Sequence, residues 1–407
     1  MKCGLLGRTL GHSYSPQIHS YLGDYPYTLF EKEPEDVGSF LQKGDFTAIN
    51  VTIPYKKDVM PFCAELTDCA KKMGAVNTIV RRADGTLIGH NTDYFGLHYT
   101  FKRMGLSLKG KKVLVLGSGG ASVTTVIVLR ELGANVVIIS RSGENNYSNL
   151  YLHRDAAAIV NTTPVGMYPK AGVSPVDLDM FPQLEGVLDI IYNPARTRLL
   201  LDAAERNIPC ENGLWMLVAQ AKEAAEWFTG TNLSNDIIPE IYAKMCKRME
   251  NIVLVGMPGC GKSTIGRLLA RELNREFVDA DAEIVKEAGM SIPEIFAKQG
   301  EDGFRKIETQ VLARLGQKSC LVLATGGGCV TRAENYAHLH QNGTIYWIQR
   351  DITSLPTDGR PLSQTGGLEQ MYLLRKPLYE LFADYTVSND GSLDDAVAKI
   401  LKGQNYK

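Results

Sequence analysis

A glycine-rich loop in the second half of the chain has the residue types needed to bind phosphate. The sequence "GMPGCGKS", at positions 256–263, follows the apolar run "NIVLV" and precedes a helix-like segment. This is the spacing G-x-x-x-x-G-K-[ST], in which backbone N–H groups surround the phosphates, Lys262 reaches the β- and γ-phosphate oxygens and Ser263 ligates Mg²⁺. The loop predicts a nucleoside triphosphate site without identifying the acceptor. The residues expected at the nucleotide are Gly256, Gly259, Gly261, Lys262, Ser263 and Thr264.

Two carboxylates follow the next predicted strand. The sequence "FVDADAEI", at positions 277–284, places Asp279 and Asp281 two residues apart at the strand end. Because alternate residues of a strand face the same way, we expect both side chains on one side. One carboxylate could then join the metal shell, and the other could contact an acceptor hydroxyl.

A second glycine-rich loop of a different kind lies at positions 117–122, "GSGGAS", between the strand-like run "KKVLVL" and a helix-like segment. It is a variant of the dinucleotide fingerprint, whose glycines let the backbone approach a pyrophosphate at a helix N-terminus. A plain tight turn is the alternative. Ser140 and Arg141 follow the next strand, where an arginine beside a hydroxyl suits the 2′-phosphate of NADP. Arg141 could instead be an ordinary surface residue.

Four further stretches carry polar residues framed by glycine and proline. In "GHSYSPQIH", Ser13 and Ser15 lie two apart, so both hydroxyls would face the same way in an extended chain. The others are "NVTIPYKKD" at 50–58, "GAVNTI" at 74–79 and "GHNTDYFG" at 89–96. Each stretch by itself would usually be a turn.

Taken together and in this order, with "NTTPVGM" at 161–167 and "GLWMLVAQ" at 213–220, these stretches resemble the shikimate dehydrogenase family over nearly all of residues 1–247. The resemblance implies reduction of 3-dehydroshikimate by NADPH, with Lys56 and Asp93 as the acid/base pair. It assigns the substrate to Ser13, Ser15, Thr52, Asn77, Tyr192 and Gln220. It assigns NADP(H) to Gly117, Ser118, Gly119, Gly120, Ala121, Ser140, Arg141 and Gly213.

The expected pair has a chemical reason. Reduction of a ketone by hydride needs a proton donor at the nascent alkoxide, and a nearby carboxylate can orient a lysine for that task. Lys56 could also be a surface lysine like Lys57, but Lys56 occupies the family position in "NVTIPYK". Quinate is the alternative substrate, and the Ser13/Ser15 pair favours shikimate.

The stretches around the phosphate loop suggest a second family. "GEDGFRKIE" supplies Arg305, "ATGGGCV" supplies Gly326, Gly327 and Gly328, "DGRPLSQ" supplies Arg360 and "LLRKPLYE" supplies Arg375. Each arginine by itself could be a solvated ion-pair member. The ordered set is similar to shikimate kinase over about residues 251–402.

This second resemblance implies a division of roles. Arg305, Arg375 and the glycines at 326–328 would hold the substrate carboxylate and ring, and Asp281 would contact the phosphorylated hydroxyl. Arg360, on a mobile lid, would neutralise phosphoryl charge, and Ser263 with Asp279 would hold Mg²⁺. The alternative is a non-catalytic module that senses shikimate.

The chain departs from both families in one place each. Between Arg141 and Asn161 it is too short for the usual helix and strand, so we expect a trimmed nucleotide domain. Between Asp351 and Gly359 it is again short and lacks the usual basic residue against adenine, and "RPLSQ" replaces a more apolar lid.

The elements that position these residues read as α/β. Apolar runs such as "TAINVTI", "NVVIIS", "CLVLAT" and "TIYWIQ" alternate with helix-like segments, which indicates parallel sheets. We predict a substrate domain at 1–100, a Rossmann-type NADP domain at 101–247 whose last helices return to the substrate domain, and a P-loop kinase with a parallel sheet at 250–407. A helix at 236–249 would end the first half, and without a Gly/Ser/Pro linker the halves should have limited freedom.

Bulk composition agrees with two or three folded units. The chain has 407 residues, 44% hydrophobic and 22% charged, and a formal net charge of −1, which indicates no attraction to nucleic acid or membrane. Eight scattered cysteines fit a reducing compartment. No signal peptide or membrane-spanning run is evident, so we expect a cytoplasmic enzyme that acts on small molecules. The sequence sets no oligomeric state.

Overall fold

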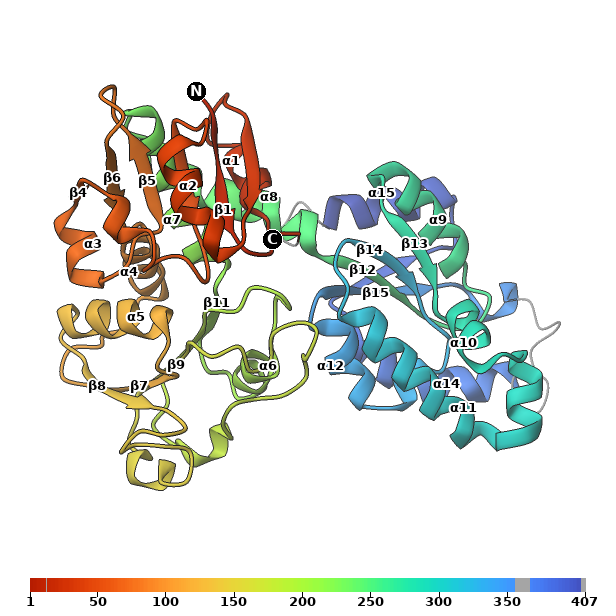
Figure 1. Cartoon of the computed structure of the whole chain (residues 1–407). Coiled ribbons are helices and arrows are strands. Elements are labelled where there is room, and N and C mark those ends of the chain that lie inside the picture. Colours follow the sequence, from red (N-terminus) through yellow and green to blue (C-terminus); the bar gives the residue numbers. More distant parts are fainter. Residues whose placement is uncertain (12, 356–366, 404–407) are drawn as a thin grey trace. The chain divides into compact units, whose positions relative to one another are not determined.

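The computed structural model describes residues 1–11, 13–355 and 367–403, and the chain forms two compact units. The first unit comprises Met1–Val165, Ser174–Tyr192 and Asp202–Met245. The second comprises Gly166–Val173, Asn193–Leu201 and Cys246–Lys407. Each unit is α/β, as the alternating apolar runs predict (Figure 1).

The first sheet of the first unit contains six strands in the order β2-β1-β3-β5-β6-β4. Its strands are β1 (Cys3–Gly7), β2 (Tyr27–Glu31), β3 (Ala48–Val51), β4 (Glu65–Leu66), β5 (Thr78–Arg81) and β6 (Leu87–His90). The neighbouring helices are α1 (Ser15–His19), α2 (Pro34–Lys43) and α3 (Asp68–Met73), with a 3₁₀ turn at Met60–Phe62. Its apolar core gathers side chains such as Leu6, Leu41 and Ile79, all fully buried.

This sheet is mixed, a feature that the sequence analysis did not anticipate. β1 pairs in parallel with β2 and β3, whereas β3–β5 and β5–β6 are antiparallel. β5 and β6 run antiparallel because a tight turn connects them, in which Gly85, at φ +87°, donates its N–H to the carbonyl of Arg82. The sequence Asp84-Gly85 favours such a hairpin turn, since glycine adopts positive φ without steric cost.

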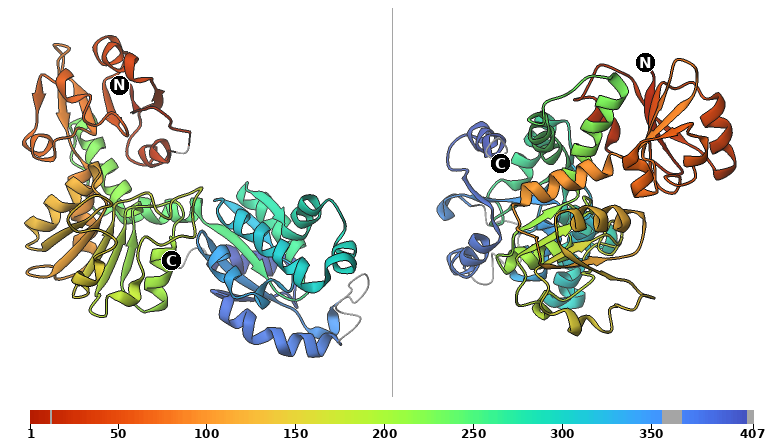
Figure 2. Two further views of the ribbon diagram at one scale, coloured as in Figure 1. Left: turned by 60° about the horizontal axis from the view of Figure 1, so that its bottom comes forward. Right: turned by 90° about the vertical axis from the view of Figure 1, so that its left-hand side faces the viewer.

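The second sheet of the first unit is parallel throughout, in the order β11-β10-β9-β7-β8. Its strands are β7 (Lys112–Leu116), β8 (Asn135–Ile139), β9 (Ala158–Asn161), β10 (Gly186–Asp189) and β11 (Cys210–Asn212). The helices are α4 (Asp93–Met104), α5 (Gly120–Glu131), α6 (Arg198–Glu205) and α7 (Leu214–Thr229), with 3₁₀ turns at Leu150–His153 and Leu178–Met180. Figure 2 shows these strands side by side.

This sheet has five strands, one fewer than a six-stranded dinucleotide-binding sheet. Only a 3₁₀ turn lies between β8 and β9. The segment between Arg141 and Asn161 was predicted to be too short for the usual helix and strand, and neither is present among the described residues between β8 and β9. The interior of β7 is completely buried, since helices cover both faces of a parallel sheet.

The second unit has one parallel sheet in the order β13-β14-β12-β15-β16. Its strands are β12 (Asn251–Val255), β13 (Glu276–Asp279), β14 (Leu321–Ala324), β15 (Gly343–Gln349) and β16 (Tyr385–Ser388). The helices are α9 (Lys262–Leu273), α10 (Ala280–Ala288), α11 (Ile292–Gly316), α12 (Glu334–His340), α14 (Leu368–Phe382) and α15 (Leu393–Gly403), with 3₁₀ turns at Cys329–Thr331 and Ile352–Ser354. In Figure 1, α9 and α15 cover one face of the sheet, and α11, α12 and α14 cover the other. The central strand β12 leads directly into the phosphate loop.

Helix α8 (Ile237–Met249) joins the two halves of the sequence, and only Glu250 separates it from β12, which begins at Asn251. The helix agrees with the one predicted at 236–249, and its side chains Ile238, Ile241 and Met245 are buried. Among the residues that the structure describes, no helix is both long enough and apolar enough to cross a membrane.

Candidate active sites

The phosphate loop of the second unit runs from β12 to α9 through a backbone that requires glycine. Gly256, Gly259 and Gly261 have φ of +145°, +82° and +103°. A Cβ on Gly261 would lie 2.5 Å from Nδ2 of Asn389, so this position also lacks space for a side chain. The amine of Lys262 is buried and donates to the carbonyls of Gly256 at 2.9 Å and Met257 at 3.0 Å. The loop therefore holds the ammonium group of Lys262 beside the N-terminal amides of α9, a position that favours the binding of a phosphate.

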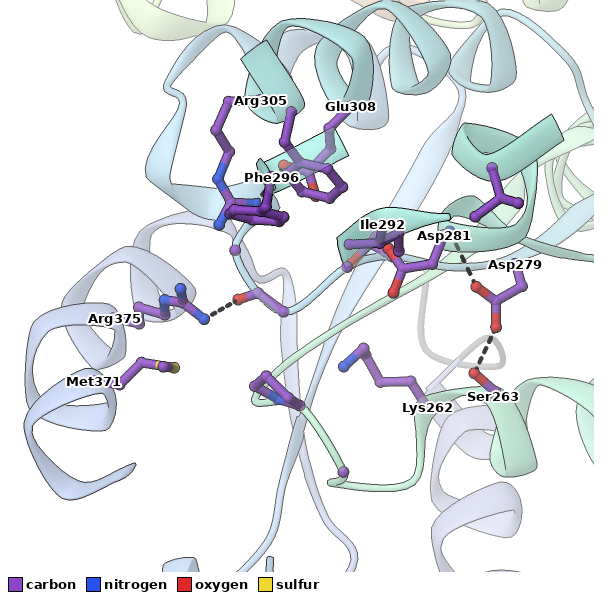
Figure 3. A pocket seen from close by; sticks show the side chains of 18 of the residues that line it. Lys262, Ser263, Asp279, Asp281, Ile292, Phe296, Arg305, Glu308, Met371 and Arg375 are labelled. Carbon is purple, nitrogen blue, oxygen red and sulfur yellow. Dashed lines mark hydrogen bonds and ion pairs between the residues drawn. The ribbon is translucent and has the colours of Figure 1, made fainter. Parts of the chain in front are cut away.

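Ser263 and Asp279 form the pair expected to hold a metal. The Ser263 hydroxyl donates to Oδ2 of Asp279 at 2.7 Å (Figure 3). A hydroxyl and a carboxylate from two elements are hard oxygen ligands of the kind that Mg²⁺ uses alongside phosphates and water. The donor set therefore fits Mg²⁺.

The expected strand geometry of the two carboxylates is wrong. Asp279 ends β13, but Asp281 lies in the first turn of α10. Oδ1 of Asp279 accepts from the N–H of Asp281 at 3.1 Å and caps the helix, which is why the strand does not continue. Both side chains still line the same cavity, because the cap brings the first turn of α10 back beside Asp279.

The acceptor side of the cavity contains a buried ion pair. Nη1 of Arg305 donates to Oε2 of Glu308 at 2.7 Å, and Nη2 lies 3.2 Å from Oε1 of Glu301. Arg305 and Glu308 are almost completely buried. Burial raises the pKa of Glu308, and the adjacent Arg305 guanidinium opposes that rise. Nε of Arg305 is buried and has no hydrogen-bond partner within the described residues.

The glycine turn at 326–328 lies between these side chains. A Cβ on Gly326 would lie 2.6 Å from Oε1 of Glu308, and one on Gly328 would lie 2.0 Å from Nη2 of Arg305. Nη1 of Arg375 donates to the carbonyl of Gly327 at 3.3 Å. The turn must therefore consist of glycines if the charged groups are to reach the cavity.

One cavity of about 690 Å³ brings most of the predicted kinase residues together. Figure 3 shows Ser263 and Asp279 on one side of it, and Arg305 and Arg375 on the other. The predicted residues that line it are Gly259, Gly261, Lys262, Ser263, Thr264, Asp279, Asp281, Arg305, Gly326, Gly327, Gly328 and Arg375. Gly256 lies at the start of the loop, outside this lining. Arg360 lies outside the described residues.

The sequence analysis missed several cavity residues. Glu308 is three residues after Arg305, a helical spacing that could have identified it as an ion-pair partner. The apolar lining includes Ile292, Phe296, Phe304 and Met371. Such side chains look like ordinary core residues in a sequence, so no signal distinguished them.

In the first unit, the structure brings together the predicted acid/base pair. Nζ of Lys56 donates to Oδ2 of Asp93 at 2.6 Å. The two side chains are 30% and 14% exposed, so the pair is accessible from solvent but largely enclosed. Lys56 follows β3, and Asp93 is the first residue of α4. The amine is thus oriented by a carboxylate from a different element.

A hydrogen-bonded chain links Asn77, Thr92 and Gln220. Oδ1 of buried Asn77 accepts from the N–H of Thr92 at 2.8 Å, and Nδ2 donates to the Thr92 hydroxyl at 3.0 Å. The Thr92 hydroxyl lies 3.2 Å from Oε1 of Gln220, whose amide nitrogen donates to the carbonyl of Leu217. The two predicted substrate residues are therefore held rigidly through Thr92, for which the sequence analysis assigned no role.

The extended-chain expectation for Ser13 and Ser15 is wrong. Tyr14 between them has helical dihedral angles, φ −88° and ψ −1°, and Ser15 begins α1 with proline in its first turn. The Ser13 hydroxyl accepts from the N–H of Ser15 at 3.2 Å, a local bond that favours a turn over extended chain. Ser15 is buried beside Tyr27, and the hydrogen bond from Ser15 partly opposes the rise that burial causes in the pKa of Tyr27.

The remaining predicted substrate residues are half-buried. Tyr192 packs edge-on against Tyr14, with ring centroids 6.1 Å apart. A Cβ on Gly7 would lie 2.8 Å from Cγ2 of Thr52, so Thr52 packs over the end of β1. Asn50, to which no role was assigned, is buried and accepts a hydrogen bond from the Tyr27 hydroxyl at 2.7 Å.

The predicted dinucleotide loop joins β7 to α5. Gly117 has φ +106°, and nothing lies within 4 Å of a Cβ built on Gly119 or Gly120. Because α5 begins at Gly120, its N-terminal amides border this open space, which fits a pyrophosphate. Ser118 is exposed, and Ala121 is half-buried at the start of α5.

The other predicted NADP residues occupy two further segments. Ser140 follows β8, with its N–H donating to the carbonyl of Asn145 at 3.1 Å, and Arg141 is exposed. Gly213 precedes α7, and a Cβ there would lie 1.9 Å from the carbonyl oxygen of Ile190. A side chain at Gly213 would therefore displace β10 or the start of α7.

Comparison with known proteins identifies the first half. Residues 5–79 match the family model of the shikimate dehydrogenase substrate binding domain. The shikimate dehydrogenase (NADP(+)) of Clostridium beijerinckii is 35% identical over 260 residues, which cover 59% of this chain and 96% of that protein. The chain belongs to the shikimate dehydrogenase family.

Solved structures agree with this assignment. Shikimate dehydrogenase 1 from Peptoclostridium difficile is 34% identical with a TM-score of 0.56, over 60% of this chain and 98% of that one. The Thermus thermophilus enzyme, solved with NADP(H) and shikimate, is 28% identical with a TM-score of 0.55, over 60% and 99%.

The second half matches a different family. Residues 258–403 match the family model of shikimate kinase. The chain is therefore a fusion of a shikimate dehydrogenase part and a shikimate kinase part, as the two ordered sets of motifs predicted.

Proposed function

We propose that the chain catalyses two consecutive reactions. The dehydrogenase part reduces 3-dehydroshikimate to shikimate with NADPH, and the kinase part transfers the γ-phosphoryl group of ATP to the 3-hydroxyl of shikimate. The observation that carries this proposal is that each part has its own set of reactive side chains, with Lys56 and Asp93 in contact in the first unit and Lys262, Asp281 and Arg305 around one cavity in the second. The scattered cysteines support a reducing, cytoplasmic setting.

In the dehydrogenase part, Lys56 acts as the general acid. Residues 117–121 would hold NADPH, with Arg141 at its 2′-phosphate, and the bound cofactor would supply hydride to the ketone carbon. As the carbonyl electrons move to oxygen, Lys56 donates a proton there, and the product is a hydroxyl. Asp93 orients the ammonium and stabilises its charge before transfer, and solvent reprotonates the amine because Lys56 is partly exposed.

In the kinase part, catalysis is mainly positioning. Arg305 and Arg375 bind the shikimate carboxylate, and Asp281 orients the 3-hydroxyl and accepts its proton. The hydroxyl oxygen bonds to the γ-phosphorus while the bond between that phosphorus and the β–γ bridging oxygen breaks, releasing ADP. Lys262 stabilises charge on the β- and γ-oxygens. Ser263 and Asp279 would hold Mg²⁺, which adds charge neutralisation when bound.

Two single substitutions test whether the reactions are separate. We expect Lys56→Ala to lower dehydrogenase turnover by about 10²–10⁴-fold, the range of a lost general acid, and to leave kinase turnover unchanged. Lys262→Ala should abolish kinase turnover and leave dehydrogenase turnover unchanged. The measurements are NADPH oxidation and ADP release, and each variant is the control for the other. Loss of both activities from either substitution would contradict the proposal.

Two rivals have distinct outcomes. A higher kcat/KM on quinate than on shikimate in the oxidative direction would replace the proposed substrate. If the purified chain with MgATP and shikimate releases no ADP above background, the second unit is a shikimate-sensing module instead of a kinase. The retained Lys262, Ser263, Asp279 and Asp281 support catalysis.

A further inference from the structure

His90 is a buried side chain next to the dehydrogenase site that the proposed reaction does not use. It ends β6 and directly precedes Asn91, Thr92 and Asp93. Only 9% of its side chain is exposed. The imidazole stacks on Trp227, with centroids 4.4 Å apart and planes at 28°. A buried imidazole with two ring nitrogens needs specific polar partners.

The partners of His90 determine which nitrogen carries the proton in the neutral ring. Nδ1 lies 2.8 Å from Oγ1 of Thr67, which already accepts the N–H of Ala70 as the cap of α3. The Thr67 hydroxyl keeps one lone pair and its hydrogen, so it can pair with Nδ1 in either tautomer. Nε2 lies 3.5 Å from Oε1 of Glu223 on α7, and because a carboxylate oxygen only accepts, that neighbour favours the N–H on Nε2.

Glu223 has His90 as its neighbour at ion-pair distance. Burial raises the pKa of Glu223, and the adjacent imidazole of His90 opposes that rise. Glu226 and Lys222 also face it, but Nζ of Lys222 is bound to Oε1 of Glu226 at 2.7 Å. Oε2 of Glu223 and Nε2 of His90 have no hydrogen-bond partner within the described residues. The two enclosed side chains therefore meet at ion-pair distance, without a hydrogen bond between them.

One face of α7 packs against the segment in which β6 ends and α4 begins. Met216, Gln220, Glu223 and Trp227 are spaced by four, three and four residues, which places them on one helical stripe. A Cβ on Gly96 would lie 2.7 Å from the carbonyl oxygen of Met216 and 3.1 Å from Cβ of Gln220, so the backbones meet closely there. The stripe then contacts Thr92 through Gln220, and His90 through Glu223 and Trp227.

We propose that His90 and Glu223 are positioning residues for the dehydrogenase site, which fix the rotation of α7 against the β6–α4 corner. This inference rests on the proposed dehydrogenase function. Stacking on Trp227 alone permits sliding, whereas the electrostatic contact between Nε2 and the carboxylate favours one position of Glu223, and so of α7. A shift of α7 by one residue would rotate Gln220 by about 100°, away from Thr92. The same contact holds the segment that carries Asp93.

The test compares Glu223→Ala and Glu223→Gln in the full chain, by shikimate oxidation with NADP⁺. We expect Glu223→Ala to raise KM for shikimate about five- to tenfold through Gln220, with a smaller fall in kcat, as for loss of one enclosed polar contact. Glu223→Gln keeps an oxygen acceptor for Nε2 and should restore KM to within about twofold. If Glu223 only stabilised the fold, we would expect neither a larger change in KM than in kcat for Glu223→Ala nor the recovery of KM in Glu223→Gln.

Glu226→Gln is the matched control, since it perturbs another enclosed carboxylate of α7 that lies off the stripe. It should leave KM for shikimate unchanged, and kinase turnover reports on the second unit in every variant. The inference is overturned if Glu223→Ala leaves KM unchanged, if Glu223→Gln is as impaired as Glu223→Ala, or if Glu226→Gln raises KM equally. If Glu223→Ala does not fold, the comparison of Glu223→Gln with His90→Ala decides, because His90→Ala must then raise KM. Failure of the proposed function would appear differently, as an inactive wild-type dehydrogenase.

Discussion

The charged groups of the kinase cavity depend on residues without side chains. Oε1 of Glu308 and Oδ1 of Asp281 both lie within 3 Å of the position that a Cβ on Gly326 would take. Nη2 of Arg305 lies 2.0 Å from the corresponding position on Gly328. The turn therefore leaves room for the carboxylates of Glu308 and Asp281 and for the guanidinium of Arg305.

Gly328→Ala should disrupt the Arg305 guanidinium specifically. The new methyl group would overlap Nη2, so the guanidinium must move and its pair with Glu308 must weaken. We expect KM for shikimate in the kinase reaction to rise at least about tenfold, the equivalent of one lost charge-assisted hydrogen bond. KM for ATP should change little. Both are measured by ADP release.

Gly391→Ala provides the control for that measurement. A Cβ there would meet only Oδ2 of Asp395 at 3.6 Å, an ordinary contact, so KM for shikimate should stay at the wild-type value. Equal effects of the two alanines would show that general loss of packing, and not displacement of Arg305, controls substrate binding.

At the residue scale, contacts between side chains could be predicted from the sequence more reliably than the local conformation of the backbone. Lys56 and Asp93 were expected to act together, and they lie 2.6 Å apart. Ser15 and Asp281 were treated as parts of extended chain, but each lies in the first turn of a helix. In both cases a short polar side chain two residues earlier bonds the backbone N–H, which strand alternation does not take into account.

At the scale of the element, α11 carries Arg305 and begins with a capping contact. Oε2 of Glu294 accepts from the N–H of Ser291 at 2.8 Å and from its hydroxyl at 2.6 Å. These hydrogen bonds hold the pKa of Glu294 below its ordinary value. Gly300, at φ +70°, interrupts the helix before Arg305. The cap thus stabilises the segment before the kink.

The sign of the pH effect follows from that lowered pKa. A carboxylate with a lower pKa in the folded state adds stability above its ordinary range and loses it as pH falls through the folded-state pKa. Glu294→Gln should therefore lower the unfolding midpoint of the kinase unit at neutral pH, and the difference from wild type should shrink in acid. Chemical denaturation across pH measures it. Glu369→Gln, at the first turn of α14, should show a smaller dependence on pH, because among the described residues Glu369 makes no capping hydrogen bond.

Elements were predictable where the pattern was long and apolar. The runs at 112–117, 251–256 and 344–349 correspond to β7, β12 and β15, because strands buried on both faces contain little else. The hairpin of β5 and β6 was missed, although Asp84-Gly85 carries the turn signal. The flanking strands are only four residues long, and four residues give little periodicity.

At the scale of the whole molecule, each unit has its own apolar cores. Among the described residues, one core cluster of the second unit gathers buried side chains between Ile252 and Ile400, and three clusters of the first unit gather side chains between Cys3 and Phe228. The chain also contributes Asn193–Leu201 to the second unit, where Nη1 of Arg196 donates to the carbonyl of His340 at 2.7 Å. A stretch such as "NPARTRL" looks like an ordinary loop, so its place in the second unit could not be predicted from sequence.

Separate cores lead to a prediction about ligands. Because each ligand binds one folded unit, NADP⁺ should raise the unfolding temperature of one transition, and a non-hydrolysable ATP analogue with Mg²⁺ should raise that of the other. At one hundred times the dissociation constant, each ligand adds about 2.7 kcal/mol to the free energy of unfolding. Differential scanning calorimetry of the full chain resolves the two transitions. Lys262→Ala should remove the rise in unfolding temperature caused by the nucleotide and keep the rise caused by NADP⁺, because Lys262 belongs to the second unit. A single transition that either ligand shifts would mean that the units unfold together, with Asn193–Leu201 as the segment to substitute next.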